Sequence, residues 1–160
     1  MIPEKIRKSV RKMTSPYDIM VIGPLTVHHD HEKIRDFYDA IVESCNKLGY
    51  NAYNAHKFTD PYKNPDISPE EVYSINKKLI CSAELVIAYV GAPSTGTGME
   101  MEIAESNKVP IILVYEKTDK ISRMVLGNPS VIKKVIFTTF EETISKIQKA
   151  VESYFESQIK

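Results

Sequence analysis

Short apolar runs that alternate with amphipathic segments are the feature that most limits how this chain can fold. Strands buried on both faces lose the polar alternation of half-exposed strands, so continuous apolar runs are typical of a parallel sheet covered by helices. The pattern predicts a doubly wound α/β fold, flavodoxin-like or Rossmann-like, with a mainly parallel five-stranded sheet and helices on both faces. The expected strands are residues 18–23, 50–54, 85–90, 109–115 and 134–138.

Apolar stripes and end signals predict the helices between these strands. One stripe covers residues 34–48 and ends at a glycine, and residues 68–71, Ser-Pro-Glu-Glu, are typical of a helix start. Further helices are expected at about 98–107 and over the apolar line within 144–155. The polar, proline-bearing stretch 57–69 is predicted to be a long irregular loop.

The length and charge of the chain limit the class of protein. At 160 residues it is the size of one domain, and we predict a single α/β domain over residues 15–160 after a basic amphipathic helix over residues 1–14. That helix is interpreted as a surface or dimer arm, with a nucleic-acid or lipid contact as the alternative. The 21 basic and 21 acidic side chains balance, so the overall charge favours neither nucleic acid nor an anionic membrane as a partner.

Cysteine content and hydropathy favour a cytoplasmic protein. Cys45 and Cys81 have no CxxC partner, which speaks against a zinc site or a disulfide framework. The apolar runs are too short to cross a bilayer, and residues 1–13 lack the apolar block of a secretory signal. We therefore expect a reduced, cytoplasmic setting and no membrane partner.

The loops after the first and third expected strands carry candidate binding residues. In doubly wound sheets ligands bind beyond the carboxyl ends of the strands, where the strand order reverses, so the loops with Gly23 and Gly96 should lie together. Gly96 and Gly98 allow close approach of a ligand, and the hydroxyls of Ser94 and Thr97 lie near a helix N-terminus that favours anions. The same residue types also make ordinary turns, so both interpretations stay open.

Glu100 follows this glycine loop and is the candidate catalytic carboxylate. A glutamate in the first turn of a helix is often only a solvated partner of the exposed amides. The alternative is a nucleophile that faces the crevice. Glu102 points about 200 degrees around the helix from Glu100, so the two cannot serve one site.

Residues 94–114, STGTGMEMEIAESNKVPIILV, carry the most specific pattern in the chain. This stretch resembles the signature of the nucleoside 2-deoxyribosyltransferase superfamily and of its hydrolytic relatives, the 2'-deoxynucleoside 5'-phosphate N-hydrolases, in which a Gly-x-Gly-x-Glu loop leads into a helix and then a strand. The resemblance extends over about residues 17–155, including the Gly23-Pro24 loop and the segment 123–142.

The resemblance implies roles for two residues of the loop. Glu100 would be the nucleophile that attacks the anomeric carbon of the sugar, expels the base and forms a glycosyl-enzyme ester. Ser94 would hold a 5'-phosphate, assisted by the amides of residues 96–98. The resemblance also implies a homo-oligomer, a dimer or larger, in which neighbouring subunits share sites.

The sequence departs from the family where the leaving base is protonated. The family's aspartate that helps in this step falls at Asn76, and asparagine cannot be an acid. The proton would then come from His56, Asp60 or a tyrosine, or the base would leave without a protein acid.

The first loop, GPLTVHHD, also departs from the family. The arginine and serine that the hydrolases place there have no counterpart, and Thr26, His28 and His29 are the candidate substitutes. Adjacent histidines on one loop rarely close a tetrahedral shell, so we predict no metal site, and we expect no cofactor. The predicted substrate-binding residues are Gly23, Pro24, Thr26, His28, His56, Tyr89, Ser94, Gly96, Thr97 and Gly98.

These observations predict an enzyme that acts on a small-molecule nucleotide or nucleoside. The leading hypothesis is an N-glycosidase that hydrolyses the base–sugar bond of a nucleoside 5'-monophosphate, with deoxyribose favoured, through an intermediate on Glu100. The alternatives are base exchange by a nucleoside 2-deoxyribosyltransferase, a catalytically weak nucleotide-binding sensor, and cleavage of a nicotinamide dinucleotide. The identity of the base stays open.

Overall fold

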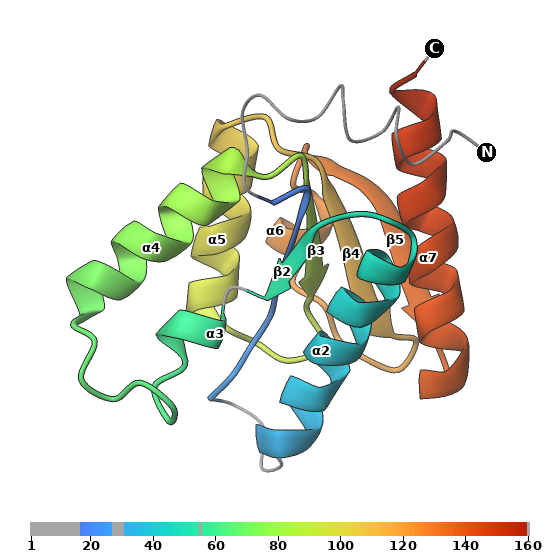
Figure 1. The fold of residues 1–160 in the computed structure, drawn as a ribbon. Helices are drawn as coiled ribbons and strands as arrows, with labels where there is room; N and C mark the ends of the chain where they lie inside the picture. Colours follow the sequence, from blue (N-terminus) through green and yellow to red (C-terminus); the bar gives the residue numbers. More distant parts are fainter. Residues whose placement is uncertain (1–16, 27–30, 55, 160) are drawn as a thin grey trace.

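The computed structural model describes residues 17–26, 31–54 and 56–159 of the chain (Figure 1). The predicted helix at 1–14 lies outside these residues. One five-stranded sheet has the order β2-β1-β3-β4-β5, and every neighbouring pair is parallel. The strand order reverses between β1 and β3, so the predicted fold class is confirmed. The strands are β1 (Ile19–Ile22), β2 (Ala52–Asn54), β3 (Leu85–Tyr89), β4 (Ile111–Glu116) and β5 (Val131–Phe137).

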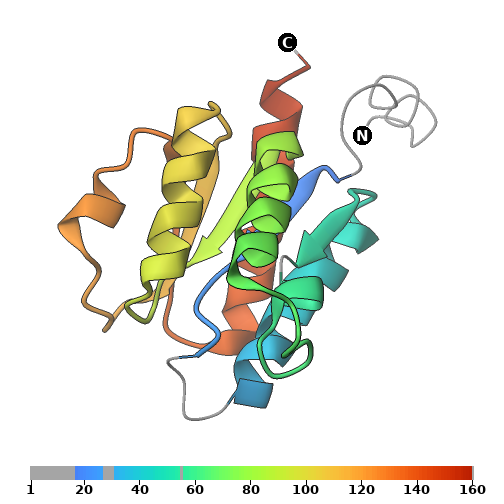
Figure 2. The ribbon, with the colours of Figure 1, turned by 90° about the vertical axis from the view of Figure 1, so that its left-hand side faces the viewer.

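Helices cover both faces of the sheet (Figures 1 and 2). Alternate residues of a strand point to opposite faces, so Ile19 and Val21 join one hydrophobic core while Met20 and Ile22 join the other. None of the described helices is long and apolar enough to cross a membrane. The helices over the first core are α2 (His31–Lys47) and α7 (Phe140–Ser157), and those over the second are α4 (Pro69–Ser82) and α5 (Thr95–Ser106).

Two helix ends confirm their sequence signals. Before α4, the Ser68 side chain accepts a hydrogen bond from the Glu71 amide, and the Glu71 carboxylate accepts one from the Ser68 amide. This reciprocal pair is a capping box, and it fixes the start of the helix. Gly49, after α2, has a φ of 87°, in the left-handed region that favours glycine.

The structure differs from the prediction at the start of α5 and at two short helices. α5 begins at Thr95 rather than near 98, because the Ser94 side chain accepts a hydrogen bond from the Thr97 amide and caps the helix there. The expected loop 57–69 overlaps a short helix, α3 (His56–Thr59), and another, α6 (Arg123–Leu126), follows β4. Four residues make about one helical turn, which is too short to show a periodic apolar stripe.

Candidate active site

The carboxyl ends of β1 and β3 form the base of the candidate site. These strands are parallel neighbours, with Ile22 paired to Ala88, so the loops that follow them meet at one edge of the sheet. At Gly23, directly after β1, a Cβ atom would come within 2.2 Å of the Tyr38 hydroxyl. That hydroxyl donates a hydrogen bond of 2.8 Å to the carbonyl of Pro24. Glycine is therefore needed at position 23 because Tyr38 holds this loop closely.

Glu100 is buried in the second turn of α5. The helix has no acidic residue in its first turn, and Glu100 is only 7% exposed. Glu102 is exposed, as its position on the opposite side of the helix predicts. The interpretation of Glu100 as a solvated first-turn partner of the helix amides is therefore wrong.

Asn76 on α4 contacts Glu100 directly. Its side-chain Nδ2 donates a hydrogen bond of 3.0 Å to Glu100 Oε1, and its Oδ1 accepts one of 3.2 Å from the hydroxyl of Thr59. Thr59 is the last residue of α3 and is itself buried. Side chains from α3, α4 and α5 thus form one chain of hydrogen bonds that ends on the candidate nucleophile.

The surroundings of Glu100 favour its neutral form. Burial raises the pKa of this carboxyl to about 8, and the hydrogen bond from Asn76 lowers it by a smaller amount. An amide can stabilise a carboxylate by donating a hydrogen bond, but it brings no positive charge. A buried carboxyl with a strongly raised pKa at the edge of a parallel sheet is typical of a functional site.

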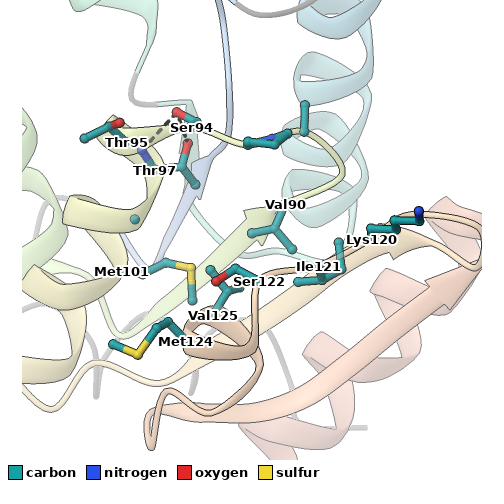
Figure 3. Close-up of a pocket in the computed structure, with 13 residues that line it drawn as sticks. Val90, Ser94, Thr95, Thr97, Met101, Lys120, Ile121, Ser122, Met124 and Val125 are labelled. Carbon is teal, nitrogen blue, oxygen red and sulfur yellow. Dashed lines mark hydrogen bonds between the residues drawn. The ribbon is translucent and has the colours of Figure 1, made fainter.

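A pocket of about 510 Å³ lies between the N-terminal end of α5 and the segment 120–125 (Figure 3). Ser94 and Thr97 contribute hydroxyls to one side, and Lys120 and Ser122 line the other. The Ser94 Oγ accepts hydrogen bonds of 3.2 Å from the Thr97 amide and 3.1 Å from the Thr97 hydroxyl. Glu100 is not among the residues that line this pocket, and it accepts a hydrogen bond from Asn76 on α4 instead.

The glycines near this pocket differ in what surrounds them. A Cβ atom at Gly98 would meet no atom within 4 Å, whereas one at Gly91 would come within 2.3 Å of the Tyr89 hydroxyl. Glycine inside a helix costs about 1 kcal/mol relative to alanine. Gly98 lies in α5 and lines the pocket, so its missing side chain leaves space for a ligand rather than relieving a clash.

His56, at the start of α3, presents an unpartnered nitrogen. Burial lowers the pKa of its imidazole to about 4, and a hydrogen bond with the backbone of Gly23 raises it by less. Its Nε2 is buried without a hydrogen-bond partner in the described part of the chain, so Nδ1 is the atom that faces Gly23. The backbone group of Gly23 that raises the pKa of His56 is its carbonyl, because a carbonyl can only accept a hydrogen bond and so favours the protonated ring. Nδ1 therefore carries the proton, and Nε2 is a free acceptor.

Asp60 is held in an ion pair with Arg35. The Arg35 Nε and Nη2 atoms contact the two carboxylate oxygens at 2.5 and 2.8 Å, and the Tyr62 amide donates a third hydrogen bond of 2.9 Å. Burial raises the pKa of Asp60, but these hydrogen bonds outweigh it, so the pKa lies below its usual value. Asp60 is therefore ionised at neutral pH and has no proton to give.

The remaining predicted residues lie in the hydrophobic core, at the surface or outside the described residues. Tyr89 packs into the core, with its ring edge-on to Phe37 at 5.4 Å between centroids. Thr26 is exposed in the loop after β1. His28 and His29 fall outside the described residues. Within residues 17–26, 31–54 and 56–159, no three His, Cys, Asp or Glu side chains are grouped to hold a metal ion.

Three residues of the site carry no motif that reveals them in the sequence. Tyr38, Arg35 and Thr59 lie 14, 25 and 17 residues from their partners Pro24, Asp60 and Asn76. The apolar stripe of α2 includes Tyr38, but it gives no sign that the hydroxyl closes the first loop. The opposite charges of Arg35 and Asp60 are the one available signal, and many surface residues share it.

Two proteins that are similar in sequence to this chain carry the same name. No family model matches the chain. A Methanosarcina mazei protein named "Putative 2'-deoxynucleoside 5'-phosphate N-hydrolase 1" is 28% identical over 118 residues, which cover 72% of this chain and 71% of that protein. A Methanosarcina barkeri protein of the same name is 36% identical over 63 residues, which cover 39% of this chain and 40% of the relative.

Solved structures share the fold at lower identity. A Clostridium botulinum CMP N-glycosidase has a TM-score of 0.64 and 18% identity, with 82% of this chain and 98% of that chain covered. A 2-deoxyribosyltransferase from Bacillus psychrosaccharolyticus has a TM-score of 0.56 and 17% identity, with 78% of this chain and 88% of that chain covered. At these identities, the likeness shows the fold.

Proposed function

The resemblance to the nucleoside 2-deoxyribosyltransferase superfamily is thereby confirmed, and on this premise we propose that the chain is an N-glycosidase of nucleoside 5'-monophosphates, with deoxynucleotides favoured. The observation that carries the proposal is the buried Glu100 carboxyl. It lies near the N-terminal end of α5 and accepts a hydrogen bond from the Asn76 side-chain amide. The relatives named as a 5'-phosphate N-hydrolase and a CMP N-glycosidase support the nucleotide as the substrate class.

Glu100 is the nucleophile in the proposed reaction. One carboxylate oxygen bonds to the anomeric carbon while the bond from that carbon to the base breaks, and the base leaves with the electron pair. Water then attacks the same carbon and gives up a proton, which balances the proton taken up by the base, and the ester bond to Glu100 breaks, which releases the sugar phosphate and restores the carboxylate. A carboxylate suits both steps because each transition state carries positive charge on the sugar.

The 5'-phosphate is assigned to the N-terminal end of α5. Free amides and the helix dipole favour an anion there, and Ser94, Thr97 and Lys120 line the adjoining pocket. Thr97 and Glu100 are three residues apart, which is less than one helical turn. A ribose ring can bridge this separation, so a phosphate in the pocket is compatible with an anomeric carbon at Glu100.

Asn76, Asp60 and His56 are not the source of the proton that the leaving base receives. Asn76 has none to give, Asp60 is ionised beside Arg35, and His56 presents a free acceptor at Nε2. His56 is therefore assigned to binding a donor group of the substrate, such as an exocyclic amine or a sugar hydroxyl. A tyrosine or water would then protonate the departing base, and protonation by water favours slow turnover.

Base release from a panel of ribonucleotides and deoxyribonucleotides, with the matching nucleosides, tests the proposal. We expect release that needs the 5'-phosphate and falls on the order of 10⁴-fold or more in Glu100→Gln. The matched control is Glu102→Gln, because Glu102 is exposed two residues away in the same helix. Release that persists unchanged in Glu100→Gln would remove the proposed nucleophile.

The asparagine at the family's acid position favours one alternative, a nucleotide-binding sensor with little turnover. Calorimetry that detects tight nucleotide binding, together with no base release after long incubation, would support that function. Base exchange by a deoxyribosyltransferase shares the same intermediate. Adding a free acceptor base separates the two, because exchange yields a new nucleotide while hydrolysis yields the sugar phosphate alone.

A further inference from the structure

The buried hydroxyl of Thr59 stands at the far end of the hydrogen-bond chain that reaches Glu100. It donates to Asn76 Oδ1 at 3.2 Å, and Asn76 Nδ2 donates to Glu100 Oε1 at 3.0 Å. Thr59 is 7% exposed, while Asn76 is only half-buried on α4. The amide therefore lies between a fixed buried hydroxyl and the candidate nucleophile, with part of its own surface open to water.

An amide at position 76 faces a problem of orientation that a carboxylate lacks. The two oxygens of a carboxylate are equivalent, but an amide has one acceptor end and one donor end. An ionised Glu100 only accepts, so the Asn76 amide serves it only when Nδ2 points to it. A donor at the opposite end, on Oδ1, holds the amide in that orientation and polarises its N–H toward the carboxylate.

We propose that Thr59 is a positioning residue whose hydroxyl holds the Asn76 amide against Glu100 and so keeps the buried carboxylate ready to attack. The catalytic role in this inference rests on the proposed function. The hydrogen bonds from Thr59 to Asn76 and from Asn76 to Glu100 do not depend on it. Without the hydroxyl, the half-buried amide loses its anchor and turns toward water. Glu100 then loses the hydrogen bond that stabilises its ionised form.

Few other groups near Glu100 can replace this stabilisation. Burial and the Asn76 hydrogen bond are the two influences on the pKa of Glu100 within the described residues. Arg35 is engaged by Asp60, and Lys77 lies over the ring of Tyr73 on the half-exposed side of α4. Other titratable groups on the elements around Glu100 include Tyr38 on α2, His56 and Lys57 on α3, Glu70, Glu71, Lys78 and Cys81 on α4, Glu102 and Glu105 on α5, and Tyr89 on β3.

The test compares Thr59→Val with Thr59→Ser by two measurements. The first is the pKa of Glu100 in the free protein, from carbon-13 NMR of labelled glutamate carboxyls, with Glu100→Gln identifying the signal. The second is the pH profile of kcat/KM, which reports groups of the free enzyme. We expect Thr59→Val to raise the Glu100 pKa, to lower kcat/KM at pH 7 about three- to tenfold, and to converge with wild type at high pH. Thr59→Ser should restore both.

Two further variants keep the result interpretable. Thr143→Val removes another buried threonine hydroxyl, which donates to the backbone carbonyl of Thr139 just before α7, and it should leave both measurements unchanged. Thr59→Ala should reproduce Thr59→Val, and it takes the place of that variant if the valine side chain disturbs folding. An unchanged Glu100 pKa in both Thr59→Val and Thr59→Ala overturns the inference, and so does an equal shift in Thr143→Val. Absence of base release in every protein would refute the proposed function, while the NMR titration would still decide the role of Thr59.

Discussion

Asp60, after α3, and Glu100, in α5, are two buried carboxyl groups in opposite environments. Asp60 is 1% exposed and is held by two hydrogen bonds from Arg35 and one from the Tyr62 amide. Glu100 is 7% exposed and accepts one hydrogen bond, from the neutral amide of Asn76. The pKa of Asp60 is therefore lowered, while the pKa of Glu100 is raised to about 8.

The contrast separates a structural carboxylate from a candidate catalytic one. An ion pair with several hydrogen bonds fixes the charge of Asp60 and joins the loop after α3 to α2. A carboxyl buried without a cation is costly to ionise, and proteins accept such a cost chiefly where a reactive group is needed. The same amino-acid change, from carboxyl to amide, should therefore have opposite effects on stability at the two positions.

The largest expected effect is a gain of stability in Glu100→Gln. Because the folded-state pKa of Glu100 is raised from 4.5 to about 8, the folded state binds more protons than the unfolded state between these values. Wild-type stability therefore falls as pH rises through this window, and glutamine removes the loss. We expect Glu100→Gln to gain on the order of 4 kcal/mol at pH 8 and little at pH 4.5, measured by urea unfolding at both pH values. A gain that does not depend on pH would show that the cause lies elsewhere.

The opposite sign is expected for Asp60→Asn. The change leaves Arg35, whose side chain is 12% exposed, charged and without its carboxylate, and breaking such a buried pair costs about 3 kcal/mol. Urea unfolding at pH 7 measures this loss. The control is Glu43→Gln, because Glu43 pairs with Lys47 on the exposed side of α2 and should change stability little. Equal losses of unfolding free energy in both variants would mean that burial does not determine how much the Arg35–Asp60 ion pair stabilises the protein.

The contrast also marks what the sequence could predict. The sheet and the long helices follow from local periodicity and from caps such as the Ser68–Glu71 box, so the sequence was sufficient for them. The approach of Asn76 to Glu100 was foreshadowed by the resemblance, which places the family's acid at position 76. The different environments of Asp60 and Glu100 could not be predicted in this way. They depend on Arg35, which reaches Asp60, and on Thr59, which reaches Asn76, and both contacts form only through tertiary packing.

The smallest expected effect concerns the pocket beside α5, the helix that carries Glu100. Gly98→Ala adds a methyl group where no atom lies within 4 Å, so the better helix propensity of alanine should raise stability by about 0.5–1 kcal/mol. Gly98 lines the pocket, so nucleotide affinity should fall about tenfold in calorimetric titration if a ligand occupies the space that the methyl group takes. Gly23→Ala is the control, since its methyl group would meet the Tyr38 hydroxyl at 2.2 Å and should lower stability instead. If the Gly98→Ala variant binds nucleotide as tightly as wild type, the phosphate does not bind at this part of α5.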